Sequence, residues 1–244
     1  TAAGISKVSY IMTDDRNVKY AYNAEKDVFQ VVSKEGEDHT IYFKGPYTMS
    51  MTAYAPYTGE RGTLAGVIQA STTSEKQVGT ARATIDFLYA EGGGSQTNPR
   101  VEFQFFHKMS QLVLAFKAGG GLELDDISYT LKNIILDGSF DTSAGSVASG
   151  KTTGNINMSL AKGKEMNSSV IVFPQKLAST LLLELAMGGK TYAQPIGNGI
   201  DLISGNTYIF DVTIAPQSMT VSPAKIEDWI WGENSDHYVI AGES

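Results

Sequence analysis

Short segments of this chain alternate apolar and polar residues, which is the pattern of a β-strand with one buried face. The clearest case is Tyr208–Ile214, where the even positions are apolar and Asp211 and Thr213 face the other way. Gly205 and the asparagine after it supply a turn before this segment, and Pro216 breaks the ladder after it. The segment is therefore predicted to be a half-buried strand.

Many short apolar runs separated by turn-forming residues favour antiparallel β-sandwiches over alternating strands and helices. The chain has 25 glycines and 7 prolines, and no long helical period is found. The predicted strands are Ile5–Met12, Asp27–Val32, Thr40–Phe43, Tyr47–Tyr54, Leu64–Ala70, Thr84–Tyr89, Val101–Phe116, Asp126–Leu136, Ser168–Phe173, Thr180–Met187, Thr191–Ile196 and Thr207–Ile214.

One segment, Lys176–Met187, admits two interpretations. It is rich in Leu, Ala, Glu and Met, which favour a helix. However, Leu181, Leu183 and Leu185 alternate with their neighbours, and a segment of roughly twelve residues is marginal for a helix. The strand interpretation is favoured.

The longest predicted strand, Val101–Phe116, changes its alternation partway. Its first apolar residues are at odd positions and its later ones at even positions. A one-residue slip moves every later side chain to the other face, so a bulge is expected between Phe106 and Gln111. His107 falls inside it, with no other histidine or carboxylate nearby in sequence. A structural role for His107 is favoured over that of a ligand or base.

Two tandem antiparallel β-sandwich domains are expected, residues 1–118 and 119–244. Ala118–Gly121 contains three consecutive glycines and would make a flexible joint. A second glycine-rich stretch, from Gly92 to Pro99, is expected to be a hairpin loop of the first domain. With 244 residues, 42% of them hydrophobic, the chain can bury a substantial core.

Composition excludes several partners and chemistries. The net charge of -7 argues against nucleic acid or an anionic membrane surface as a partner. Cysteine is absent, so disulfides, thiolate metal sites and cysteine nucleophiles are excluded. No apolar run approaches the length of a membrane-spanning helix. The chain starts at Thr1 without a methionine, which fits either a processed end or a trimmed piece.

Gly145–Thr152 matches the phosphate-binding pattern G-x-x-x-x-G-K-[ST] at every position. Phosphate binding there requires a helix after the loop, yet Thr153–Asn157 contains poor helix formers. A chance match is therefore favoured. Nearby, Asp137, Ser139 and Asp141 alternate as in a calcium loop, but the closing glutamate is missing. A polar hairpin is predicted, with a weak cation site left open.

No catalytic, cofactor or metal site is predicted. The chain has only three histidines, and no serine lies in a Gly-x-Ser-x-Gly turn. Adjacent carboxylates face opposite sides of a strand and cannot act on one substrate. Core packing is favoured for most tyrosines, with a sugar-stacking platform as the alternative. The tyrosines in question are Tyr42, Tyr47, Tyr54, Tyr57 and Tyr89.

The last third of the chain is distinctive because it holds both tryptophans. Trp229 and Trp231 would share one strand face, so this end of the chain is expected to be docked rather than frayed.

Several short motifs resemble the fimbrillin (Mfa-like) family of pilus subunits and surface adhesion proteins of Gram-negative bacteria. They occur in the family's order and cover nearly the whole chain. The motifs are Ala53–Tyr57, Asp86–Ala90, Phe105–Leu112 (Phe-x-His-x-x-Ser-x-Leu), Pro174–Gln175, Gly205–Tyr208 (Gly-x-x-Tyr) and Ile226–Gly232 (Ile-x-x-Trp-x-x-Gly).

The resemblance implies an all-β fold with two sandwiches of transthyretin-like, Greek-key topology. It also implies a structural or adhesive subunit of a surface fimbria, in which a terminal segment of one subunit completes the sheet of its neighbour. Other fimbrial subunits would then be the partners, and a lipid on an upstream segment would tether the protein to the outer membrane. The residues expected to contact a neighbouring subunit are Ile5, Val8, Tyr10, Tyr238, Val239 and Ile240.

The alternative is a lipid-tethered surface module that binds a glycan or a host protein. Stalk, tip and anchor positions in a fimbria all stay open at this stage.

Overall fold

The computed structural model describes residues 2–7, 16–26, 28–43, 46–162, 166–197 and 199–230, with the backbone alone for residues 2–7. The described part is almost entirely strands, as predicted, with two short 3₁₀ helices, η2 (Ser74–Lys76) and η3 (Gly79–Thr84). The strands are β1 (Ala2–Lys7), β2 (Val18–Asn23), β3 (Val28–Val31), β4 (Met49–Ala55), β5 (Val67–Ser71), β6 (Leu88–Gly94), β7 (Phe106–His107), β8 (Ser110–Ala118), β9 (Ile127–Ile135), β10 (Asp137–Asp141), β11 (Ser146–Ser149), β12 (Thr153–Leu160), β13 (Asn167–Val172), β14 (Leu182–Met187), β15 (Lys190–Pro195), β16 (Asn206–Ala215), β17 (Ser218–Val221) and β18 (Lys225–Asp228).

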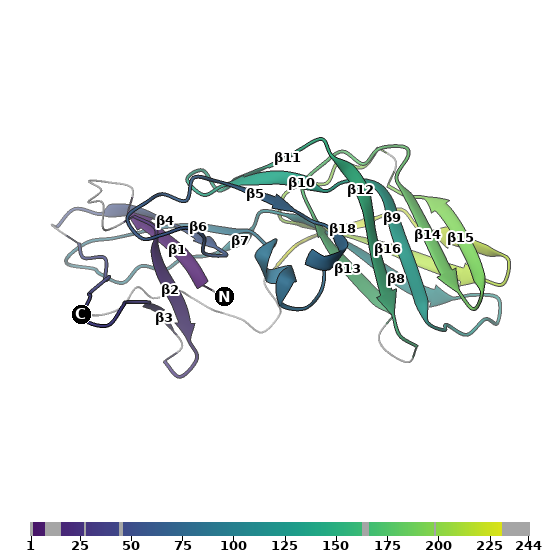
Figure 1. The fold of residues 1–244 in the computed structure, drawn as a ribbon, viewed down its shortest axis with the longest axis horizontal. Helices are drawn as coiled ribbons and strands as arrows, with labels where there is room; N and C mark the ends of the chain where they lie inside the picture. Colours follow the sequence, from purple (N-terminus) through teal and green to yellow (C-terminus); the bar gives the residue numbers. More distant parts are fainter. Residues whose placement is uncertain are drawn as a thin grey trace.

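A six-stranded sheet of order β3-β2-β1-β4-β6-β7 forms what we call the first unit, on the left of Figure 1. All its pairs are antiparallel, and β1 lies inside the sheet between β2 and β4. A core cluster that includes Val18, Met51, Ala90 and Phe103 covers one face of this sheet.

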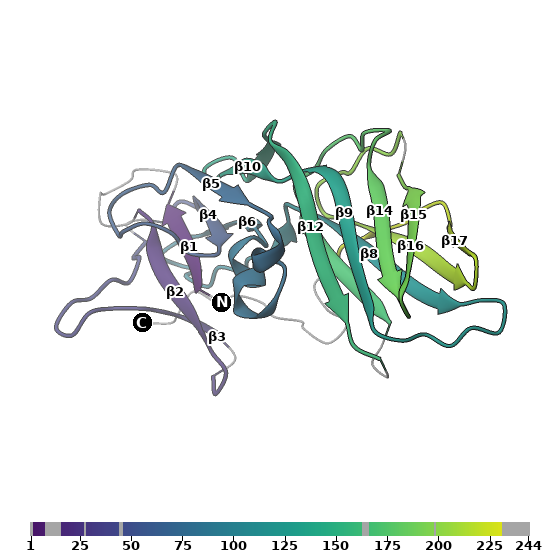
Figure 2. The same cartoon turned by 45° about the vertical axis from the view of Figure 1, so that its right-hand side comes forward.

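Two packed sheets form the second unit, a β-sandwich on the right of Figures 1 and 2. One has the order β12-β9-β14-β15, and the other the order β13-β8-β16-β17, with β18 also paired to β16. Their inward side chains, such as Leu114 of β8, Leu131 of β9 and Phe210 of β16, share the largest core cluster. Strands β8 and β16 are parallel, whereas the other pairs are antiparallel. The expected β-sandwich fold is confirmed.

A small sheet of order β11-β10-β5 joins the two units. Beneath it lies a third core cluster, built from Tyr54, Phe87 and Tyr89 of the first part of the chain and from Phe140 and Phe173 of the later part. The Phe87 and Phe140 rings stack at 4.8 Å between centroids. Burial of aromatic rings from both sides fixes the units against each other.

The alternation patterns located several strands correctly. Tyr208–Ile214 lies within β16, and its even positions are buried. Leu182–Met187 is strand β14, so the strand interpretation of that segment is confirmed and the helix is rejected. The polar segment at Asp137–Asp141 forms the predicted hairpin, because β10 pairs with β11.

The single strand predicted for Val101–Phe116 is wrong. Residues 101–105 belong to no strand of the described structure, and β7 and β8 then belong to different sheets. The change of alternation comes from this switch at Lys108 and the fully buried Met109, not from a bulge. Thr40–Phe43, another predicted strand, also lacks strand pairing.

The predicted loop at Gly92–Pro99 is also wrong in its first half. Gly92, Gly93 and Gly94 are strand residues of β6 paired with β4. The side chains of Val101 and Phe103 pack where a Cβ atom of Gly92 would lie. The glycines therefore allow a close approach to the sheet, rather than a turn.

The division into domains at residues 118 and 119 stays a prediction. Strand β8, which precedes that position, pairs with β13 and β16 of the second unit.

Replacement of Gly92 by alanine should lower the free energy of unfolding by about 1–3 kcal/mol, because overpacking forces neighbouring groups apart. The added Cβ would lie 2.8 Å from the Val101 side chain and 3.0 Å from the Glu102 carbonyl oxygen. Gly93→Ala, on the opposite face of β6, is the matched control and should cost less. Chemical denaturation of both variants measures the difference, and equal stabilities would contradict the proposed packing.

Candidate functional site

The residues predicted to contact a neighbouring subunit are only partly within the described structure. Ile5 lies in β1, opposite Val18 of β2 on one side and Ala53 of β4 on the other. The backbone of this strand is therefore paired along both edges. Val8, Tyr10, Tyr238, Val239 and Ile240 lie outside the described residues, as does Trp231. The contact role of all six stays a prediction.

Two segments, residues 40–43 and 101–105, pack against the core cluster on one face of the six-stranded sheet. We call these two segments the open layer. Val101 and Phe103 are fully buried, while Glu102 and Gln104 between them are exposed. Ile41, Phe43 and Phe105 are partly buried against the same core cluster. The layer thus has the alternating faces of a sheet.

The two segments meet over strand β6. A Cβ atom on Gly94 would lie 2.5 Å from the Phe43 ring and 3.0 Å from the Val101 side chain. Within the described residues, neither segment belongs to a strand ladder, and residues 101–105 make no backbone-to-backbone hydrogen bond to another described residue. Residues 101–105 therefore bury alternate side chains as a sheet strand does, while no described strand pairs with their peptide groups.

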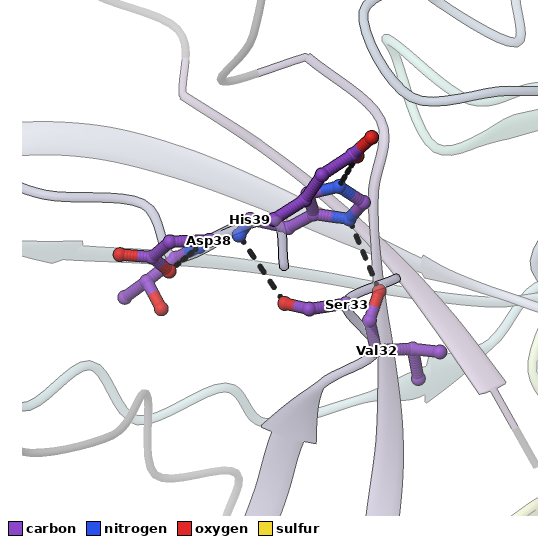
Figure 3. A network of polar contacts seen from close by, with 6 residues as sticks. Val32, Ser33, Asp38 and His39 are labelled. Carbon is purple, nitrogen blue, oxygen red and sulfur yellow. Dashed lines mark hydrogen bonds and ion pairs between the residues drawn. The ribbon is translucent and has the colours of Figure 1, made fainter. Parts of the chain in front are cut away.

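A local polar network around His39 holds residues 32–43 in place (Figure 3). The His39 ring is buried, with Nδ1 3.2 Å from the Val32 carbonyl oxygen and Nε2 2.6 Å from a Glu37 carboxylate oxygen. The His39 backbone N–H donates to Ser33 Oγ. Because both ring nitrogens face acceptors, only the doubly protonated imidazolium donates to both.

Asp38 fixes the start of the segment in the same network. Its carboxylate accepts the Tyr42 hydroxyl at 2.6 Å and the Thr40 backbone N–H at 2.9 Å. The hydrogen bonds from Tyr42 and Thr40 lower the pKa of Asp38 to about 2. The hydrogen bond and charge of His39 likewise lower the pKa of Glu37. The side chains of Asp38 and His39 thus help to fix the position of this segment.

His107 has a carboxylate partner that sequence proximity did not reveal. Its Nδ1 atom lies 2.7 Å from Asp86 Oδ1, a residue 21 positions earlier in the chain. The buried imidazole also stacks on Trp229, with 3.9 Å between ring centroids and 5° between planes. The Trp229 backbone N–H donates to the Gly205 carbonyl oxygen. Trp229 is therefore docked against His107, whereas Trp231 and the residues after it lie outside the described structure, so docking of the chain end stays a prediction.

The phosphate-like motif lies in a β-hairpin and its exit. Strand β11 runs through its middle, and β12 follows it where phosphate binding requires a helix. Asp137 accepts hydrogen bonds from the Thr152 backbone N–H and hydroxyl. Asp141 accepts the backbone N–H groups of Ser143 and Ala144, and these bonds, with that of the Ser143 hydroxyl, lower its pKa. Both carboxylates thus shape turns.

Among the described residues, no group of three potential metal-binding side chains is found. Within the same ranges, no helix has the length and apolar character needed to cross a membrane.

The five candidate sugar-stacking tyrosines do not form one platform. Tyr54 and Tyr89 are buried in the cluster between the units, whereas Tyr47 is 84% exposed and Tyr42 is 49% exposed. The Tyr54 hydroxyl donates to Asn17 Oδ1 and to the Thr58 carbonyl oxygen. Burial raises the pKa of Tyr54 to about 12. Packing therefore accounts for two of the five rings.

Comparisons with known proteins agree on one family. The family model described as fimbrillin-like matches residues 4–229. A Bacteroides uniformis protein named "Putative fimbrium subunit Fim1C" is 27% identical, over 95% of this chain and 78% of its own length.

Two solved structures have the same fold. A "putative cell adhesion protein" from Bacteroides ovatus is 32% identical, with a TM-score of 0.86 over 95% of this chain and 88% of its own. Another from Bacteroides uniformis is 24% identical, with a TM-score of 0.76 over 94% of this chain and 91% of its own.

Stability should fall between pH 10 and pH 12, partly because of Tyr54. Its pKa is raised in the folded state, so the unfolded chain loses this proton first as pH rises from 10. The contribution of the protonated Tyr54 hydroxyl to the free energy of unfolding is complete below pH 10 and is lost as pH approaches about 12. Urea unfolding across this range should show a shallower decline in Tyr54→Phe. Tyr47→Phe removes a hydroxyl from an exposed ring and is the matched control. Equal slopes in Tyr54→Phe and the unmodified chain would contradict the assignment.

Proposed function

Because the chain belongs to the fimbrillin-like family, we propose that it is a structural, adhesive subunit of a surface fimbria that joins its neighbours by β-strand exchange. The observation that carries this proposal is the segment 101–105 of the open layer, whose residues alternate in burial but pair with no strand of the described structure. A non-enzymatic role accords with this family.

The physical case for strand exchange rests on the peptide groups of residues 101–105, which no described strand pairs, beside apolar surface. An added strand would accept and donate hydrogen bonds to these peptide groups. Its alternate side chains would pack on the half-buried faces of Phe43 and Phe105. The neighbouring subunit gains the same bonds, so each contact is stabilised along a whole ladder rather than at a few side chains.

The donor that we propose is a terminal segment of a neighbouring copy or of another fimbrial subunit. Tyr238, Val239 and Ile240 supply the apolar residues expected of such a segment, and Ile5, Val8 and Tyr10 are proposed to contact it. Attachment to the outer membrane through a lipid on an upstream segment completes the proposed location at the cell surface.

Hydrogen exchange tests the open layer directly. In the monomer, the backbone amides of Val101–Phe105 should exchange rapidly, because no backbone acceptor is bonded to them in the described structure. In assembled fibres the same amides should become protected by about tenfold or more, because an added strand supplies acceptors. Mass spectrometry of both states measures the change.

The amides of Leu112 and Leu114 in β8 provide the internal control, since both ladders of β8 are already formed. Their protection should not change on assembly. Fibres that leave Val101–Phe105 unprotected would contradict strand exchange at this layer, although a fimbrial role by another contact would stand.

A second candidate function, a glycan-binding module, is favoured by the exposed rings of Tyr42 and Tyr47. Binding of the purified chain to a glycan array distinguishes this glycan-binding module from a fimbrial subunit. Signal that is lost in Tyr47→Ala and kept in Tyr54→Phe would support the module.

A further inference from the structure

Strand β13 is an edge strand whose own sequence lacks the residues that usually prevent pairing with another chain. It is the outermost strand on its side of the five-stranded sheet, and its residues, Asn167–Val172, include no charge, no proline and no glycine. Such β-branched, uncharged edges pair readily with other chains, and proteins commonly protect them with charges, prolines or bulges. The sequence of β13 uses none of these means.

Gln77 supplies the missing protection. Its side chain is 2% exposed, and its Oε1 accepts the Ile171 backbone N–H at 2.8 Å. Its Nε2 donates to the Ile171 carbonyl oxygen at 2.9 Å and to the Thr72 carbonyl oxygen at 2.9 Å. One side-chain amide therefore makes the same pair of bonds that a peptide group of an adjacent strand would make.

Arg82 binds the carbonyl oxygen and the hydroxyl of the next outward-facing residue along β13. Its Nη1 donates to the Ser169 carbonyl oxygen at 2.6 Å, and its Nη2 donates to Ser169 Oγ at 2.9 Å. Residues 169 and 171 are two apart, so their outward peptide groups lie on the same side of the strand. Gln77 and Arg82 together occupy the stretch where an incoming strand would bind.

The same connection also covers the facing sheet. Ser74 Oγ accepts the Asn157 backbone N–H of edge strand β12 at 2.9 Å, and the Thr72 backbone N–H donates to Leu136. Figure 2 shows this coiled connection between the two units, beside β12. Residues 72–86, which link β5 to β6, thus close one side of the second unit.

We propose that residues 72–86 are an edge guard, in which Gln77 and Arg82 prevent β13 from pairing with β13 of a second copy of the chain. The guard would confine strand addition to other edges of the subunit. The partner excluded is a second copy because an uncharged strand is complementary to itself in antiparallel pairing. The inference does not require the fimbrial role, since it concerns an edge distant in sequence from the open layer.

The experiment combines Gln77→Ala and Arg82→Ala in the full chain. The variant should keep a β-rich circular dichroism spectrum but form oligomers in sedimentation velocity at concentrations where the unmodified chain is monomeric. In its monomer fraction, the Ile171 amide should exchange about tenfold faster or more, because its acceptor is gone. Gln69→Ala and Arg100→Ala, which remove the same groups from exposed positions, are the matched controls and should change neither readout.

A third substitution identifies the surface that associates. Ser169→Lys in the double variant places a charge on the freed edge and should restore the monomer. Oligomers that survive this change would overturn the proposal, and so would a folded double variant that stays monomeric.

If the double variant does not fold, Gln77→Met is used instead, because methionine keeps the side-chain volume without the hydrogen bonds. A folded Gln77→Met variant that stays monomeric, or oligomers that survive Ser169→Lys, would overturn the proposal. Rapid exchange of the Ile171 amide in the unmodified monomer would also overturn the proposal. None of these readouts involves residues 40–43 or 101–105, so failure of strand exchange there leaves the test intact.

Discussion

The need of every strand-edge peptide group for a hydrogen-bond partner shapes this protein more than any single contact does. Backbone N–H and C=O groups near a core are costly when unpaired, so each edge must be covered, paired or exposed to water. The chain meets this requirement differently in its two units. The second unit covers its edge with side chains of Gln77 and Arg82, whereas residues 101–105 of the first unit join no ladder within the described part of the chain.

The same requirement is met at the junction of the units. Residues 72–86, between β5 and β6, bond to the edges of both β13 and β12. The aromatic cluster of Tyr54, Phe87 and Phe140 fills the space behind this connection. The stack of His107 on Trp229, with Asp86 holding the imidazole, adds a further tie near the end of the described chain. Polar caps and aromatic packing therefore act together at one junction.

The alternation of apolar and polar residues predicted well which side chains are buried. It predicted less well which segments pair as strands. It identified β14 as a strand despite its helix-forming residues, because Leu183 and Leu185 needed to face one core. It could not distinguish β8 from residues 101–105, since both alternate and only the former has neighbours on each side. Strand β12 escaped detection because only Ile156 among its residues is buried. The partners of His107 and of Ile171 lie 21 and 94 positions away, beyond any local pattern.

The distance of 94 residues between Gln77 and Ile171 also bears on how such proteins diversify. A chimera could take its first half from one relative and its second half from another. The residue at position 77 and the β13 edge would then come from different parents and would not have evolved together. Successful exchanges are expected to carry residues 72–86 and β13 from the same parent, so these two segments should be inherited as one module.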